Sequence, residues 1–256
     1  MRVLDNPALY NACLNSQEVI GVYLTTFKQW ELQNDAQTKI NFWFRNLENL
    51  KSELEKLNIP LVVLDAETFA NSPKVLWNFI QENDVKSLYF NNEYAFYELE
   101  RDRDIYQEFR GNGIGVFNYH DQVIHQPGSL KTTTGKNFSV YSPFKKKWFA
   151  ELDDSQLDLL PIPEPKTELG IKSSDLAEYL AGTEVSQAQY WESGEGFIQN
   201  HINEFLKTKG SAYKEERNFP NIKATSACGR THSPNSHAKF DAGSISALST
   251  RGRELF

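Results

Sequence analysis

Short runs of apolar and β-branched residues alternate with helix-like patterns through the first half of the chain. The four runs lie at residues 19–24, 59–64, 85–90 and 114–119. Each is typical of a strand buried inside a parallel sheet. Strands that alternate with helices indicate βαβ units. The pattern therefore predicts a doubly wound, Rossmann-like α/β domain with a mainly parallel sheet over residues 1–150.

Helices are expected between these strands. In the clearest, over residues 39–57, apolar side chains recur three or four positions apart and share one face: Ile40, Phe44, Leu47, Leu50, Leu54 and Leu57. Asp5-Asn6-Pro7 predicts a helix start before residues 8–13, because a capping residue precedes a proline. Further helices are expected at residues 73–83, 97–110 and 141–149. No strand is followed by GxGxxG or GxxxxGK[ST], so no dinucleotide or triphosphate loop is evident.

The pattern changes after residue 150. Residues 151–186 are acidic and rich in proline, which predicts an interdomain linker. A helical pattern returns at Gln187 and predicts a short α-helical stub over residues 187–227. Residues 228–256 have few large apolar side chains and no periodicity, so this tail is expected to be disordered.

Composition narrows the function further. The chain has 256 residues, of which 39% are hydrophobic and 24% charged, as in soluble globular proteins. It has no apolar run long enough for a membrane helix and no signal-peptide core at its start, so a cytoplasmic location is expected. Cys13 and Cys228 predict reduced thiols, and no metal site is expected from the spacing of His120, His125 and Asp121.

Charge is distributed unevenly along the chain. The formal net charge of −7 argues against a generic nucleic-acid binder. Residues 207–256 nevertheless carry 9 Lys and Arg against 4 Asp and Glu, whereas residues 1–206 carry 18 against 30. Any contact with phosphate is therefore expected in the last fifth of the chain.

Several segments, in order, resemble the DNA photolyase/cryptochrome family over about residues 2–227. Arg2 to Leu9 resembles the amino-terminal DNPAL signature, and Gln29-Trp30 follows the second strand of the family pattern, as family members commonly have it. The other matching segments are Asn91-Asn92-Glu93-Tyr94 with Arg101-Asp102, Pro127-Gly128 with Gly135, Val140 to Lys145, and Gly194-Glu195 with the residues up to Ser226. The family uses light-excited reduced FAD to split ultraviolet pyrimidine dimers in DNA, and an α/β domain holds a second, antenna pigment.

The resemblance also implies site residues. For FAD it points to Tyr213, Thr225, Ser226 and Ala227, although Thr225-Ser226 can also be read as a plain helix cap. For damaged DNA, the partner the resemblance implies, Arg217 takes the position of a phosphate-contacting arginine; the alternative is a solvated charge.

For the antenna, either a folate (methenyltetrahydrofolate) or a deazaflavin, the resemblance implies Tyr97, Glu98 and Gln33. The Glu98 carboxylate suits a pterin ring because it accepts two N–H donors. Tyr97 and Gln33 replace the usual Asn and His of the family. The alternative for Glu98 is a helix-surface charge near Arg101, three residues on.

Three departures from the family shape the functional hypothesis. The family has a strand before the DNPAL segment, so the sequence predicts two unpaired strand edges. The family pattern is also lost after Ala227, as after a frameshift, and the helical flavin domain does not continue, so the match is truncated at both ends. We therefore expect a photolyase fragment that is inactive alone. The alternatives are a cryptochrome-like or antenna-only signalling module and an unrelated nucleotide-binding α/β protein.

Overall fold

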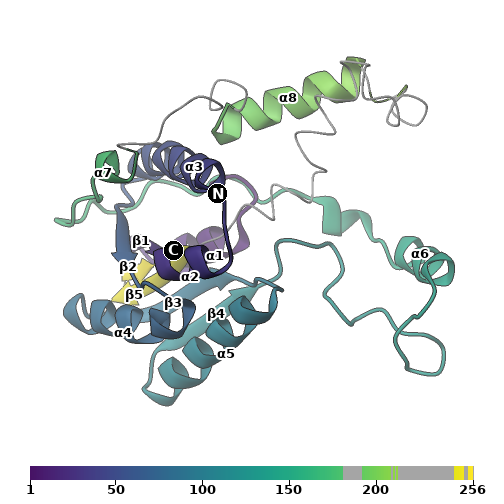
Figure 1. Ribbon diagram of the computed structural model, residues 1–256, viewed down its shortest axis with the longest axis horizontal. Coiled ribbons are helices and arrows are strands. Elements are labelled where there is room, and N and C mark those ends of the chain that lie inside the picture. The colour runs from purple at the N-terminus through teal and green to yellow at the C-terminus, as the bar shows by residue number, and fades with distance from the viewer. Residues whose placement is uncertain (181–191, 209, 211, 213–244, 251–252, 256) are drawn as a thin grey trace.

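In the computed structural model, four strands from the first half of the chain form two parallel pairs within one sheet (Figure 1). They are β1 (Glu18–Thr25), β2 (Leu61–Asp65), β3 (Val85–Asn91) and β4 (Gly115–Tyr119). β1 pairs in parallel with β2, and β3 in parallel with β4. The structure describes residues 1–180, 192–208, 210, 212, 245–250 and 253–255. The predicted α/β fold and all four predicted strands are confirmed.

Helices cover both faces of this sheet. They are α1 (Pro7–Asn15), α2 (Phe27–Leu32), α3 (Gln37–Glu55), α4 (Ser72–Glu82) and α5 (Phe96–Gly111), with a 3-10 turn at Phe69–Asn71. Figure 1 shows α4 and α5 together on one side of the strands and α3 on the other. α1 begins as the sequence predicts, because Pro7 occupies its first turn and Asn6 Oδ1 accepts the Leu9 N–H at 3.3 Å.

The hydrophobic core lies between these helices and the sheet. The apolar stripe of α3 is buried, with Leu47 and Leu54 fully excluded from solvent. It packs over β2, and Phe44 lies edge-on to Tyr23 of β1. On the other face, Leu76 of α4 and Phe109 of α5 are also fully buried. Burying such side chains contributes about 1.5 to 3 kcal/mol each relative to exposure, so this packing fixes the sheet that positions the site.

The expectation of two unpaired strand edges is wrong. β1 and β3 do not pair with each other, and two strands from the end of the chain lie between them: β5 (Ile245–Thr250) and β6 (Arg253–Leu255). β5 pairs antiparallel with β1, β3 and β6, whereas β6 pairs in parallel with β1 and β3.

Both strands lie in residues 228–256, the tail for which disorder was expected. Unpaired backbone groups of central strands favour pairing with any extended segment within reach, and such pairing needs no side-chain periodicity.

Residues 151–180, the described part of the predicted linker, follow α6 (Tyr141–Ala150) and run along the α/β domain, where they hydrogen-bond to Asp5, Leu57 and Leu61. They contain a 3-10 turn at Asp154–Leu157 and α7 (Ala177–Leu180), and α8 (Glu195–Thr208) comes later in the chain. Figure 1 shows α7 beside α3, whereas α6 and α8 lie away from the strands. No side chain of α8 is buried, and Leu206 is 63% exposed. In the described part of the chain, no helix is long and apolar enough to cross a membrane.

Candidate functional site

The candidate site lies at the carboxyl ends of β1 and β3. Open α/β sheets hold ligands outside the carboxyl ends of their strands, at the place where the strand order reverses. Here β2 lies on one side of β1, whereas β3 and β4 lie on the other side, beyond β5 and β6. The segments that follow Thr25 and Asn91 therefore border the reversal point. Both regions with predicted antenna residues belong to these segments.

The structure gives the three predicted antenna residues different surroundings. Gln33 caps the carboxyl end of α2 and is exposed. Tyr97 is 53% exposed and lies edge-on against Phe96, with ring centroids 5.4 Å apart. Glu98 lies in the first turn of α5 and is half-buried. In the described part of the chain, no hydrogen bond or ion pair joins Gln33 to Tyr97 or Glu98.

Arg101 does not pair with Glu98, contrary to the surface-charge alternative. Its guanidinium turns inward and is 2% exposed. Nη2 donates to Glu93 Oε2 and to Asp102 Oδ1, both at 2.7 Å, and the group lies over the ring of Phe69. Sequence spacing alone could not show this, because the contact to Glu93 spans the turn between β3 and α5.

The pKa values of this buried cluster follow from its charges. Burial acts to lower the pKa of Arg101, but the carboxylates of Asp102 and Glu93 outweigh it and raise that pKa above its ordinary value. Burial raises the pKa of Asp102, and the Arg101 guanidinium opposes the rise. The guanidinium therefore stays charged, and the cluster holds the start of α5 against β3.

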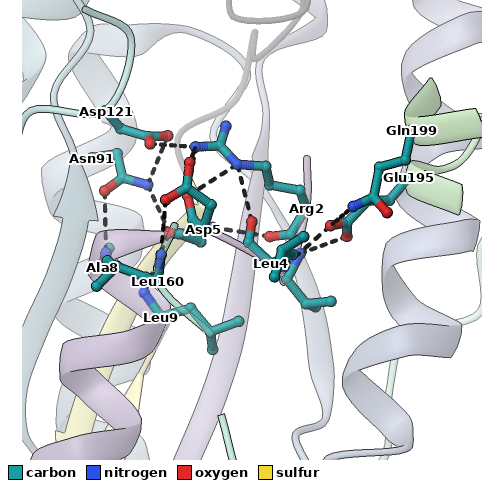
Figure 2. A network of polar contacts seen from close by, with 12 residues as sticks. Arg2, Leu4, Asp5, Ala8, Leu9, Asn91, Asp121, Leu160, Glu195 and Gln199 are labelled. Carbon is teal, nitrogen blue, oxygen red and sulfur yellow. Dashed lines mark hydrogen bonds and ion pairs between the residues drawn. The ribbon is translucent and has the colours of Figure 1, made fainter. Parts of the chain in front are cut away.

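A second polar network fixes the start of α1 against the sheet (Figure 2). Arg2 Nη2 donates to Asp121 Oδ1 just beyond β4. Asn91, the last residue of β3, donates from Nδ2 to Asn6 Oδ1 at 2.8 Å and accepts the Ala8 N–H at 3.2 Å. The network joins the end of β3, the segment after β4 and the first turn of α1, so it fixes one wall of the candidate site.

The same amino-terminal segment also contacts α8 and the linker. Glu195 accepts the backbone N–H groups of Val3 at 2.9 Å and Leu4 at 3.2 Å, as Figure 2 shows. Asp5 and Leu160 exchange hydrogen bonds, at 2.9 Å from the Asp5 N–H and 3.2 Å to its carboxylate. The start of α8 is thereby tied to the α/β domain.

An aromatic cluster joins the segment after β1 to α3, and it was not identified from the sequence. We call it the aromatic site: Thr26, Phe27, Trp30, Trp43 and Phe44. Phe27 stacks on Phe44 with centroids 6.0 Å apart and lies edge-on to Trp30 at 5.0 Å. Trp30 and Trp43 are each 1% exposed, whereas Phe27 is 38% exposed. The one sequence signal was Gln29-Trp30 after a strand, which the family resemblance included without a role.

Three polar atoms of the aromatic site are buried without a hydrogen-bond partner within the described part of the chain. They are Thr26 Oγ1, Trp30 Nε1 and Trp43 Nε1. An unsatisfied buried donor or acceptor costs about 1 to 3 kcal/mol, so such atoms are uncommon in folded proteins. Two of them are the indole N–H groups of the neighbouring Trp30 and Trp43 rings, and the third belongs to Thr26, which precedes Phe27 in the chain. A planar ligand that carries its own donors and acceptors would satisfy such atoms.

The remaining predicted site residues cannot be compared with the structure. Tyr213, Thr225, Ser226 and Ala227, predicted for FAD, lie outside the described residues, as does Arg217, predicted for DNA. Among described residues, no group of three His, Cys, Asp or Glu could hold a metal ion. His120 instead contacts the Tyr94 hydroxyl at 2.6 Å, and His125 contacts the Trp148 carbonyl at 3.0 Å.

Comparisons with known proteins agree with this architecture. The family profile described as DNA photolyase matches residues 1–166. The chain is 29% identical over 233 residues to the deoxyribodipyrimidine photo-lyase of Buchnera aphidicola, covering 88% of this chain and 47% of that protein. The chain spans about half the length of the curated relatives it matches.

Solved structures give the same result. A bacterial class III photolyase from Agrobacterium tumefaciens matches with a TM-score of 0.71 at 25% identity, over 88% of this chain and 46% of that one. A Synechocystis cryptochrome matches with a TM-score of 0.64 at 16% identity, over 85% and 47%, which concerns the fold alone. This chain belongs to the DNA photolyase family.

Proposed function

We propose that these 256 residues supply the light-harvesting part of a deoxyribodipyrimidine photolyase. The whole enzyme would repair pyrimidine dimers in DNA with FAD as its catalytic cofactor. The chain covers about half the length of its relatives, and its described residues form their α/β portion. We therefore expect it to bind an antenna pigment and to need the remaining length for repair. The likeness to a cryptochrome, at 16% identity, does not favour the signalling alternative.

The observation that carries this proposal is the aromatic site with its unsatisfied polar atoms. A deazaflavin has a planar tricyclic ring with polar atoms along its edges. Stacking on Phe27 and hydrogen bonds to Thr26 Oγ1 and Trp30 Nε1 would satisfy both features. The protein would then contribute position and a dry environment, while the pigment supplies the absorption.

Folate remains a second candidate for the antenna because of one observation. Glu98 is half-buried in the first turn of α5, at the carboxyl end of the sheet, where a carboxylate can accept two N–H donors of a pterin. The exposed Gln33 and Tyr97 would have to approach it on binding. We favour the deazaflavin class because the aromatic site brings stacked rings and unsatisfied polar atoms together, whereas among the described residues no hydrogen bond or ion pair joins Gln33 or Tyr97 to Glu98.

FAD and DNA enter this proposal through the family. Tyr213, Thr225, Ser226 and Ala227 would contact the flavin, and Arg217 would contact a phosphate of damaged DNA. All five lie in the part of the chain that turns basic, residues 207–256. A basic segment there suits an anionic flavin diphosphate and a DNA backbone.

The experiment is pigment retention by the purified 256-residue chain. The chain is incubated separately with a 5-deazaflavin, methenyltetrahydrofolate and FAD, then desalted and scanned from the near-ultraviolet to the blue. We expect retention of the deazaflavin and no repair of a dimer-containing oligonucleotide under light. Retention of no pigment would contradict the antenna proposal, and dimer repair would contradict the proposed division of labour.

A matched pair of variants tests the site itself. Thr26→Val keeps the shape of the side chain but removes the unsatisfied hydroxyl, so the ligand-free protein should lose no stability. Pigment affinity should fall about two- to tenfold if that hydroxyl bonds the pigment. Trp77→Phe, in α4, is the control and should leave affinity unchanged. Equal affinity in Thr26→Val and wild type would place the pigment elsewhere.

A further inference from the structure

Residues Ser173 to Leu176 of the linker run along the outer edge of β2 toward the aromatic site, and we call this segment the strap. Ser174 donates its N–H to the Leu61 carbonyl at 2.8 Å, and its hydroxyl accepts the Val63 N–H at 2.9 Å. Ser173 Oγ accepts the Leu61 N–H at 3.2 Å. Leu176 then inserts into the core and is 1% exposed. The strap is therefore anchored along its length up to Leu176.

The segment beyond this anchor is held far less firmly. α7 is a single turn of four residues, started by Asp175 Oδ1, which accepts the Ala177 N–H at 2.9 Å. No side chain of α7 is fully buried. A helix of this length has no stability of its own in water, so its position depends on the contacts of its side chains.

Tyr179 and Leu180 both pack against the hydrophobic core, and Tyr179 supplies the ring stacking between α7 and the domain. Its ring lies over Phe44 with centroids 4.7 Å apart and planes 1° from parallel, and it stacks on Phe27 at 5.9 Å and 16°. Phe44 is itself edge-on to Trp30 at 6.3 Å. Tyr179 is half-buried, whereas Phe44 is 1% exposed. The tyrosine ring thus forms the outer layer of the aromatic site.

We propose that α7 is a lid on the aromatic site and that Tyr179 is its closing residue. The tyrosine ring stacks on both Phe27 and Phe44, the rings that a planar ligand would contact, so ligand and tyrosine compete for one position. Opening needs α7 to swing about the anchored Leu176 and to carry Tyr179 and Leu180 off the core, with the strap left in place along β2. This inference rests on the proposed function, because it takes the aromatic site as the place where the antenna pigment binds.

A competing lid and a fixed wall of the site predict opposite effects of removing the Tyr179 ring. If Tyr179 were a wall, its removal would weaken ligand binding. If it is a competing lid, its removal makes the face of Phe44 available and strengthens binding. A stacked aromatic pair contributes about as much as a two- to tenfold change in an equilibrium constant, so we expect affinity to rise by up to about tenfold.

The test is a titration of the full 256-residue chain with 5-deazariboflavin, in which equilibrium dialysis measures the binding affinity. Tyr179→Ser should bind more tightly than wild type, and Tyr179→Phe, which keeps the stacking ring, should bind like wild type. Tyr141→Ser is the matched control, since Tyr141 lies in α6 and is 71% exposed. Circular dichroism of each variant verifies that the fold is retained.

The outcomes separate the lid from the proposed function. Tighter binding by Tyr179→Ser alone supports the lid. Binding by wild type that is unchanged or weakened in Tyr179→Ser overturns the lid and leaves the antenna site standing. Absence of binding by every protein overturns both.

Acrylamide quenching of tryptophan fluorescence gives a readout that needs no ligand. Trp30, which lies edge-on to Phe44, and Trp43, which contacts Trp30, should become more accessible in Tyr179→Ser than in Tyr179→Phe. Equal quenching in these two variants would also overturn the lid.

Discussion

Arg101 and Asp102 are neighbours in the sequence and form an ion pair in the interior, with Nη2 of one 2.7 Å from Oδ1 of the other. Consecutive helix residues do not normally face each other. They do so here because the Arg101 guanidinium folds back beneath the turn to reach Glu93 as well. One buried cation therefore neutralises two carboxylates and holds α5 to the end of β3.

Arg101→Ala should destabilise the domain strongly. It leaves the carboxylates of Glu93 and Asp102 in the interior without their cation, and loss of one partner of a buried pair costs about 3 to 5 kcal/mol. Arg103→Ala is the matched control on the same helix, because Arg103 and Asp104 are 59% and 55% exposed. That change should cost less than about 1 kcal/mol. Urea unfolding followed by circular dichroism measures both, and similar midpoints for the two variants would contradict a structural role for the cluster.

Asn91→Leu should loosen α1 from the sheet. The amide of Asn91 accepts the Ala8 N–H and donates to Asn6 Oδ1, so an apolar replacement leaves buried partners unsatisfied. We expect a loss of about 1 to 3 kcal/mol in the free energy of unfolding. Asn92→Ala, one residue later, is the control, because its side-chain bonds to His120 and Asn118 are exposed. Hydrogen exchange should show faster opening of α1 in Asn91→Leu only; the same exchange rates in both variants would contradict this prediction.

The sequence pattern was sufficient to predict strands β1 to β4 and the helices, because burial of an element requires apolar residues at regular positions. The apolar stripe from Ile40 to Leu54 and the apolar run of β1 are examples. β5 and β6 have no such apolar pattern, since their positions follow from backbone pairing between β1 and β3. Apolar patterns in one sequence predict which face of an element is buried, but they do not predict which extended segment pairs with a given strand.

The candidate site was harder to predict for a related reason. Phe27, Phe44 and Tyr179 come from three separate segments, and only the fold stacks their rings. Each residue alone is an ordinary aromatic in an apolar pattern. Glu98 could be assigned by resemblance, but its spacing to Arg101 suggested a surface pair, which the inward turn of the guanidinium excludes.

Glu98→Gln should distinguish the two antenna candidates. It keeps the size of the side chain and removes the charge that a pterin would need. If the pigment is a deazaflavin at the aromatic site, Glu98→Gln should retain it as wild type does, whereas folate retention should fall about tenfold or more because hydrogen bonds to a charged group are the stronger ones. Glu100→Gln, two positions further along α5, is the control. Loss of deazaflavin retention in Glu98→Gln alone would move the site toward α5.

Alkaline titration should weaken the hold of Tyr179 on the domain. Burial raises the pKa of Tyr179 above its ordinary value of about 10, and the carboxylates of Glu178 and Asp65 add to the rise. A raised pKa in the folded state means that its stabilising contribution is fully present below about pH 10 and is lost as pH rises through the folded value.

We therefore expect the urea midpoint of wild type to fall relative to that of Tyr179→Phe only above about pH 10. The phenylalanine ring keeps the stack on Phe44 but cannot ionise. Burial also raises the pKa of Tyr94, with a contribution from Asp121, and this residue titrates in both proteins so that it cancels in the comparison. Midpoints that decline in parallel across the alkaline range would show that the Tyr179 hydroxyl does not ionise against these carboxylates in the folded protein.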